Sequence, residues 1–305
     1  MSRSILIFKK FLYAWIEKNF MDGCSNYNTL TVRKSCRSKK QARDRFEQFN
    51  FPHARGEIFF NPLRAFEFVK KYGFPVVVKP NVSGYSRGSH FPITNYKELL
   101  KACIAVKIWW PSSVIEEYLL GENYRVVVIE GEIMSAIRRT PPFVVGDGVS
   151  DVRTLIEKEN TTREQMQLLP TMHKISSNKA QKYLHKSDLT LGSIPQKEQI
   201  IYLHNKVALA SGGVIFTEDK STISDKNKQL FQDILKAFNA NILGIDIIME
   251  HGISEDYDKQ KSICLEVNSR PYLKMHHYPR NGAKEDLTLY FEKLDRLEVN
   301  DGDIF

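Results

Sequence analysis

Two apolar segments near the end of the chain constrain its fold more than any other feature. Leu243–Met249 and Cys264–Asn268 are rich in aliphatic residues, and residues 251–261 between them are polar, charged and turn-prone. Two such segments around a polar connection predict a β-hairpin with a long loop.

Polar side chains interrupt this predicted hairpin. Asp246 stands among isoleucines, and Glu266 and Asn268 are two positions apart, so the latter two point from the same face of their strand. Oxygen ligands that meet on one sheet face suit a hard cation such as Mg²⁺, which completes its shell with water and phosphate. These residues alone also fit a second interpretation, in which they lie at the edge of an exposed hairpin.

The composition is that of a soluble globular protein. The chain has 305 residues, 42% hydrophobic and 26% charged, which allows one large domain or two to three small ones. Lys9 and Lys10 interrupt the apolar stretch 5–15, so we expect an amphipathic helix that docks on the body, with neither a signal peptide nor a membrane span. The four cysteines lack metal or redox spacing, which favours reduced thiols and a cytoplasmic location.

The positive charge permits an anionic partner. The formal net charge is +8, and residues 33–45 hold seven Lys or Arg in thirteen positions. Nucleic acid and nucleotide phosphates are both candidates. Because no basic stripe interleaved with aromatic residues and no zinc-finger spacing occurs, nucleic acid is not the expected partner.

Helical and strand patterns alternate along the chain, which predicts an α+β or a mixed α/β fold. Segment 157–197 is polar and poorly periodic, and is interpreted as an excursion from the body. The predicted helices are 43–49, 61–72, 96–106 and 226–240. The predicted strands outside the hairpin are 75–80, 113–118, 124–129 and 133–138.

Three further segments carry chemistry that suits a nucleotide. Lys79 ends an apolar strand beside the small-residue loop 81–90, where backbone N–H groups and an ammonium can bind an anion. The connector 116–125 between two strands could receive a base. Arg138 and Arg139 leave a strand together and could hold phosphate or carboxylate. Taken singly, each of these also reads as a solvated surface feature.

Together these segments resemble the ATP-grasp superfamily, within it the branch of cyanophycin synthetase and bifunctional glutathione synthetase. The resemblance covers about residues 38–282. The matching segments are Phe74–Pro80, Val114–Arg125, Arg139–Gly148, Gly244–Ile248 and Leu265–His276. The resemblance implies an ATP-grasp fold, in which two α+β subdomains clamp ATP. It also implies a ligase that activates a small-molecule carboxylate as an acyl phosphate, which an amine attacks to give an amide.

The resemblance also implies roles for individual residues. Lys79 matches the lysine on the α-phosphate, Asn123 the ribose position, and Arg139 the arginine facing the γ-phosphate and acyl group. The implied catalytic residues are Arg139 and Lys79. The implied ligands of Mg²⁺, or of Mn²⁺ in its place, are Asp246, Glu266 and Asn268. The implied nucleotide-binding residues are Lys39, Lys79, Ser83, Gly84, Gly88, Glu116, Glu117, Leu119 and Asn123. The implied substrate-binding residues are Arg125, Arg139, Lys206, Arg270 and His276, the last in a substrate-side loop.

The chain also departs from the family pattern. Asn123 replaces an acidic residue, and block 203–213 carries His204, Lys206 and Ala208 where the family has other residues. The family has a whole domain before the core, and here fewer than forty residues precede it, so we expect a homo-oligomer or a partner protein to complete the site. We divide the chain into residues 1–36, a first subdomain 37–119 and a second subdomain 120–300. The alternative to a ligase is a nucleotide-binding subunit with reduced catalysis that acts through a partner protein.

Overall fold

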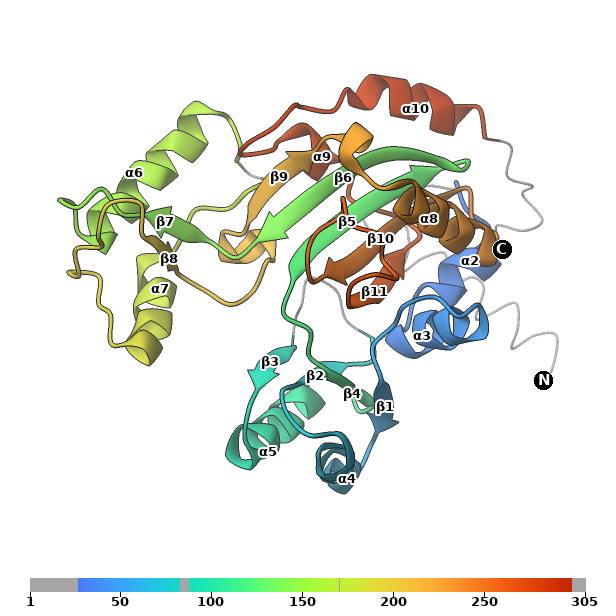
Figure 1. Cartoon of the computed structure of the whole chain (residues 1–305), viewed down its shortest axis with the longest axis horizontal. Coiled ribbons are helices and arrows are strands. Elements are labelled where there is room, and N and C mark those ends of the chain that lie inside the picture. The colour runs from blue at the N-terminus through green and yellow to red at the C-terminus, as the bar shows by residue number, and fades with distance from the viewer. Residues whose placement is uncertain (1–26, 83–87, 170, 298–305) are drawn as a thin grey trace, which may run out of the picture.

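The computed structural model describes residues 27–82, 88–169 and 171–297, and its architecture is α+β with antiparallel sheets (Figure 1). The predicted helix at 5–15 lies outside the described residues. Within the described residues, no helix has the length and apolar character needed to cross a membrane.

The smaller sheet has four strands in the order β1-β4-β2-β3. Its strands are β1 (Gly56–Phe59), β2 (Val76–Pro80), β3 (His90–Ile93) and β4 (Ser113–Glu117). Helices α4 (Pro62–Tyr72) and α5 (Tyr96–Ala105) pack on one face, and the short helix η1 (Val106–Ile108) follows α5. Asn61 caps the start of α4 and Gly73, at φ 83°, ends it, so the helix predicted over residues 61–72 begins one residue later.

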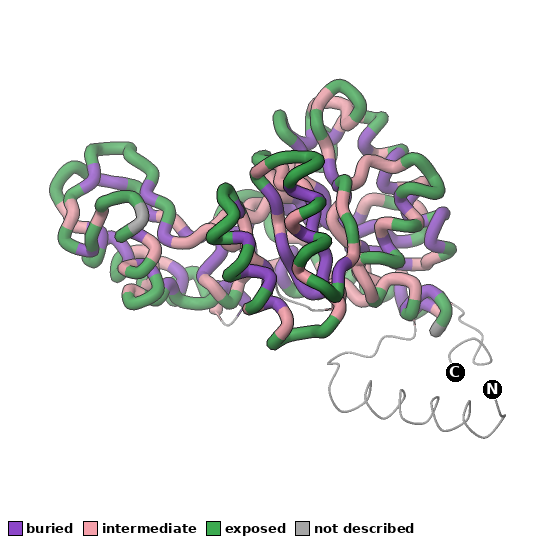
Figure 2. The backbone as a smooth tube through the Cα atoms, turned by 90° about the horizontal axis from the view of Figure 1, so that it is seen from below, coloured by how far each residue is buried: buried purple, intermediate pink, exposed green. Residues whose placement is uncertain are grey.

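The larger sheet has five antiparallel strands in the order β11-β10-β5-β6-β9. These strands are β5 (Glu122–Ile129), β6 (Glu132–Thr140), β9 (Val214–Glu218), β10 (Ile242–Met249) and β11 (Ser262–Asn268). One face packs against α8 (Asp225–Ala237) and α3 (Lys39–Gln48), and the other against α9 (Lys274–His277) and α10 (Leu287–Asp295). Helix α2 (Leu30–Ser35) precedes α3. Figure 2 shows the buried strands in the middle of the body.

The position of α3 differs from the predicted subdomain division. Ala42 and Phe46 of α3 are buried in the core of the larger sheet, although the sequence division assigns this segment to the first subdomain. The reason is the apolar face of α3, which packs under β11. The division at residues 119 and 120 stays a prediction.

The excursion is more ordered than its sequence suggests. It contains α6 (Val152–Gln165) and α7 (Ser177–Leu184), neither of which we predicted, beside a two-stranded sheet of β7 (Phe143–Val145) and β8 (Ile200–Tyr202). Apolar side chains from these elements form a separate small core. The excursion projects from the body in Figure 2. The hydrophobic periodicity of the excursion is weak because this core is small and most residues of the excursion are exposed or half-buried.

The predicted hairpin is confirmed as β10 and β11, with an irregularity that matters for function. Pairing runs Asp246 to Glu266 and Ile247 to Cys264, so one residue of β11, Leu265, is bulged. Cys264 packs in the core, and regular alternation would put Glu266 on the same face. The bulge reverses the alternation, and Glu266 therefore lies beside Asp246 on the opposite face.

Candidate active site

Charged side chains from the smaller sheet form the first half of the site. Residues Lys79 and Glu116 lie on adjacent strands, with Val77 opposite Glu116, so their side chains share a face. The ammonium of Lys79 forms an ion pair with the carboxylate of Glu116, and both side chains are more than nine-tenths buried. A buried charge pair of this kind is tolerated because each charge compensates the other.

Lys39 connects this half to the larger sheet. Ser38 caps α3, and the backbone N–H of Lys39 donates to the carbonyl of Asn81, 3.1 Å away, just beyond β2. The ammonium of Lys39 lies 3.8 Å from the carboxylate of Glu266. Burial lowers the pKa of Lys39, and the charge of Glu266 opposes part of that effect.

Arg43 is a site residue that our sequence analysis did not identify. It lies one turn after Lys39 on α3, and its guanidinium is 3.9 Å from Glu116. The available signal was the four-residue spacing of these two residues within the basic segment 33–45. Because Lys39 and Arg43 point inward, and Arg33 is also buried, this segment does not present a continuous basic surface to nucleic acid.

Two arginines and one aspartate form the second half of the site, on the larger sheet. Asp246 pairs across the strands with Arg125, which binds both of its carboxylate oxygens, one of them at 2.8 Å. A nitrogen of Arg139 lies 3.2 Å from the same carboxylate. The Nε of Arg139 also donates to Asn123, its partner across the strands, at 2.9 Å. Asn123, predicted at the ribose position, is thus held by Arg139.

Burial and charge oppose each other at Asp246. Burial raises the pKa of this carboxyl, but Arg125 and Arg139 together outweigh it and hold the pKa at about 2. Burial lowers the pKa of Arg139, and Asp246 offsets part of that effect. Asp246 is therefore ionised at neutral pH and fully engaged with two cations.

The three predicted metal ligands occupy neighbouring positions of the hairpin. Asp246 lies directly opposite Glu266, and Asn268 is two residues further along β11. The amide nitrogen of Asn268 is buried and makes no hydrogen bond among the described residues. Two carboxylates and an amide oxygen fit Mg²⁺, which keeps water and phosphate in its remaining positions. No group of three His, Cys, Asp or Glu side chains in the described ranges offers another candidate site.

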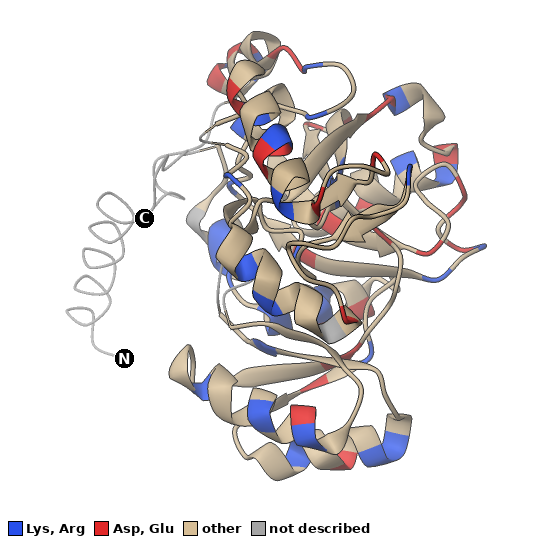
Figure 3. Ribbon diagram, turned by 90° about the vertical axis from the view of Figure 1, so that its left-hand side faces the viewer, with Lys and Arg blue, Asp and Glu red and all other residues tan. Residues whose placement is uncertain are grey.

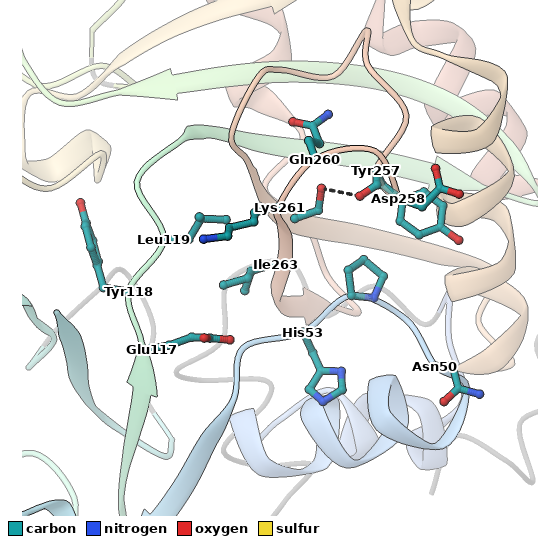
Figure 4. A pocket seen from close by; sticks show the side chains of 12 residues that line it. Asn50, His53, Glu117, Tyr118, Leu119, Tyr257, Asp258, Gln260, Lys261 and Ile263 are labelled. Carbon is teal, nitrogen blue, oxygen red and sulfur yellow. Dashed lines mark hydrogen bonds between the residues drawn. The ribbon is translucent and has the colours of Figure 1, made fainter. Parts of the chain in front are cut away.

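A cavity of about 480 Å³ lies beside the connector that joins the two sheets (Figure 4). Glu117, Tyr118 and Leu119 line one side, and Ile263 from β11 lines another. Its volume lies in the range of small-molecule sites. The carboxylate of Glu117 accepts the backbone N–H of Arg55 at 2.8 Å, whereas its neighbour Glu116 faces Lys79. These two glutamates, both predicted to bind the nucleotide, therefore point in different directions.

His276 lies in a different environment from the predicted substrate-side loop. It is completely buried in the short helix α9, and its Nδ1 is 2.8 Å from the hydroxyl of Ser135. Burial lowers its pKa to about 3, with further contributions from Arg125 and Arg139. His276 is thus a neutral imidazole beneath the two arginines. Its side chain does not reach the surface, and its role as a direct substrate contact stays a prediction.

The other predicted residues are spread more widely. Lys206 lies after β8, and burial lowers its pKa. The pKa of His90 on β3 is lowered by burial and further by the charge of Lys206. Arg270 is half-buried in the segment after β11. Gly88 has φ 69°, and a Cβ atom there would lie 2.5 Å from Trp109. Ser83 and Gly84 lie outside the described residues.

The chain is similar to known ligases. It is 31% identical to the glutathione biosynthesis bifunctional protein of Listeria monocytogenes over 222 residues, covering 70% of this chain and 28% of that protein. It is 30% identical to the cyanophycin synthetase of Nostoc over 241 residues, covering 77% of this chain and 26% of that protein. The chain therefore spans about a quarter of the length of these relatives. No family model matches the chain.

Solved structures agree on the fold. The bifunctional glutathione synthetase of Pasteurella multocida matches with a TM-score of 0.61 and 23% identity, covering 88% of this chain and 37% of that one. The ATP-grasp ligase PsnB, complexed with a minimal precursor, matches with a TM-score of 0.52 and 14% identity, covering 97% and 73%. The chain has the ATP-grasp fold and belongs to the ATP-grasp superfamily, as the sequence motifs predict.

Proposed function

We propose that this protein is an ATP- and Mg²⁺-dependent carboxylate–amine ligase that forms an amide through an acyl phosphate. The observation that carries the proposal is the convergence of Lys39, Lys79, Arg139 and the pair Asp246–Glu266 between the two sheets. Cations that receive phosphates and carboxylates that receive a metal are the two components that phosphoryl transfer needs. The names of the relatives support this class of reaction.

We infer that the nucleotide lies between the sheets. Its phosphates would meet the ammonium groups of Lys39 and Lys79, whose present partners, Glu266 and Glu116, are within ion-pair distance. Its base would occupy the connector cavity, against Leu119 and Ile263. Apolar walls and backbone polar groups of this kind suit a planar base.

Mg²⁺ would be held by Asp246, Glu266 and Asn268, and would offset negative charge on the transferring phosphoryl group. For this, Asp246 has to give up one arginine contact, and Arg139 is the weaker of the two, with a single contact at 3.2 Å. Arg139 is then available for the substrate carboxylate and the γ-phosphate. Arg125 keeps Asp246 ionised, and the neutral His276 adds no third positive charge beneath the arginines.

The reaction proceeds in two substitutions. A carboxylate oxygen of the substrate attacks the γ-phosphorus, the bond from this phosphorus to the bridging oxygen breaks, and ADP leaves. The amine nitrogen then attacks the acyl carbon, phosphate leaves, and the amine loses a proton. Arginines in the site suit an anionic acid, and we propose an amino acid or a small peptide as the substrate. A homo-oligomer or a partner protein that completes the substrate site remains part of the proposal.

A second candidate function is a nucleotide-binding subunit with reduced catalysis that acts through a partner protein. Two observations favour it: both carboxylate oxygens of Asp246 are already bound by arginine, and block 203–213 departs from the family pattern. In this case the protein would bind nucleotide but release no ADP.

Calorimetric titration with a non-hydrolysable ATP analogue, with and without Mg²⁺, tests the nucleotide site. We expect Mg²⁺-dependent binding that is lost in Lys79→Met and retained in the control Lys236→Met, an exposed lysine on α8. ADP release with pairs of acids and amines, and trapping of the acyl phosphate by hydroxylamine, then separate the two functions. Binding without ADP release supports the second function, and no binding at all contradicts both.

A further inference from the structure

The helical face of the smaller sheet carries an exposed apolar surface. On α5 and η1, Leu100, Ile104 and Ile108 are 48%, 63% and 84% exposed, and they follow each other at four-residue spacing. This spacing puts them on one side of the helical segment. Buried residues of α5 face the sheet, so the exposed stripe is in addition to the core face.

Helix α4 extends this surface. Phe66 of α4 stacks on Tyr96 at the start of α5, with ring centroids 6.0 Å apart. The carbonyl of Phe59, before α4, accepts a hydrogen bond from Lys107, after α5, at 3.1 Å. The start of α4 therefore lies beside the end of α5, and the two helices run antiparallel.

The antiparallel arrangement lines up apolar side chains from both helices. Phe60 and Leu63, at 69% and 65% exposure, fall between the two contacts on the α4 side, as Leu100 and Ile104 do on the α5 side. They form what we call the α4–α5 groove, made of Phe60, Leu63, Phe66, Tyr96, Leu100 and Ile104. Figure 1 shows α4 and α5 as the outermost layer at this end of the molecule. Exposed apolar side chains gathered on one surface and flanked by polar residues are typical of an interaction site.

The edges of the α4–α5 groove are predominantly basic. Lys97 and Lys101 of α5 and Lys70 of α4 are exposed beside it. The acidic residues are already engaged: Glu67 pairs with Arg64 at 3.3 Å, and Glu98 accepts the backbone N–H of Thr94 at 2.9 Å. Figure 3 shows the basic segments along both helices. Helices α4 and α5 carry five basic residues and two acidic ones, so the net charge beside the groove is positive.

We propose that the α4–α5 groove receives an amphipathic helix of a partner protein, with an apolar stripe and acidic flanks. A helix lying between two helices buries its apolar face and places its flanks against the groove edges. Carboxylates on those flanks would meet Lys97, Lys101 and Lys70. Complementary charge of this kind determines which partner binds and in which orientation.

The same charges oppose two other occupants. The N-terminal segment of this chain, residues 1–20, carries four basic residues and one acidic residue, so its charge has the same sign as the groove edges. In a second copy packed about a two-fold axis, both chains would use the same surface, so two basic-edged surfaces would face each other. Like charges at such positions are unfavourable.

Two synthetic peptides of about five helical turns test the proposal. They share one leucine stripe and differ in their flanks, which are glutamates in one and lysines in the other. Fluorescence anisotropy with the full chain measures their affinities. We expect the glutamate peptide to bind at least about tenfold more tightly. The double variant Lys97→Glu/Lys101→Glu should reverse this preference.

The double variant Leu100→Lys/Ile104→Lys tests the apolar contact. It should lower the affinity for the glutamate peptide at least about tenfold. The matched control is Leu289→Lys, another exposed leucine, on α10. Circular dichroism checks that each variant is folded. Equal affinity for both peptides, or binding of neither, would overturn the proposal. A dimer in light scattering that Leu100→Lys dissociates would also overturn it. So would sedimentation of the protein with anionic vesicles that Lys97→Glu/Lys101→Glu abolishes.

Discussion

Replacing Asp246 by asparagine probes the charge cluster of the larger sheet. The change keeps the side-chain shape and removes the negative charge that Arg125 and Arg139 share. Both guanidinium groups then remain buried, and Glu266 is the carboxylate left to offset their charge. Removal of one partner from a buried ion pair costs about 3–5 kcal/mol. The pKa of Asp246, about 2 in place of 3.8, corresponds to about 2 kcal/mol of stability from the charged form.

We therefore expect Asp246→Asn to lower the free energy of unfolding by about 2–5 kcal/mol, a large part of the total for an ordinary domain. Urea unfolding measures this change. Glu266→Gln is the matched control: its carboxylate is 34% exposed and lies 3.8 Å from Lys39, so its loss should cost less than about 1 kcal/mol. Both variants should lose Mg²⁺-dependent nucleotide binding.

The double variant Asp246→Asn/Arg139→Met adds a second test of the same reasoning. Removing one of the two buried guanidinium groups should recover part of the lost stability, because the two sites are in contact and their effects are not additive. If the free energy of unfolding of Asp246→Asn were within about 0.5 kcal/mol of the wild-type value, burial of the two arginines would not depend on this carboxylate. Our account of the cluster would then be wrong.

Three further predictions concern single residues. In the folded protein the pKa of His276 is about 3, below the ordinary 6.5, so the unfolded chain binds this proton first and the free energy of unfolding should fall as pH decreases from 6.5 towards 3. Urea unfolding at pH 7 and 4.5 should show a smaller pH effect in His276→Gln than in the wild type. Gly88→Ala should lower the melting temperature, since φ at this position is 69° and the new Cβ would meet Trp109. In the control Gly192→Ala the new Cβ meets no atom closer than 3.8 Å, so its melting temperature should be near that of the wild type. Lys79→Met should abolish nucleotide binding, and a wild-type affinity in calorimetry would exclude Lys79 from the phosphate site.

Much of the fold follows from local sequence signals. The apolar spacing of residues 61–72, with Gly73 after them, predicts a helix whose ends agree with those of α4 to within one residue. Helices α6 and α7 escape this reasoning because their apolar faces are short and cover only a small core. The motifs of the hairpin, of Lys79 and of the arginine segment identify the superfamily because they occur in one order along the chain.

The candidate site follows from the sequence only in part. The sequence names Asp246, Glu266 and Arg139, yet it contains no sign of the bulge that turns Glu266 towards Asp246. It also gives Asn123 a ribose role, which stays a prediction, but it does not reveal the hydrogen bond from Arg139 to this residue.

By itself, the sequence determined the longer periodic elements and the class of fold, since hydrophobic periodicity and caps act over a few residues. Only the tertiary structure decided which charges compensate one another. Arg125 and Asp246 are 121 positions apart, and they meet because β5 and β10 are neighbours in the sheet. His276 is buried against Ser135, 141 positions away, because α9 packs on β6. Electrostatic partners depend on distance in space and on burial, and neither quantity is written in the order of residues along the chain.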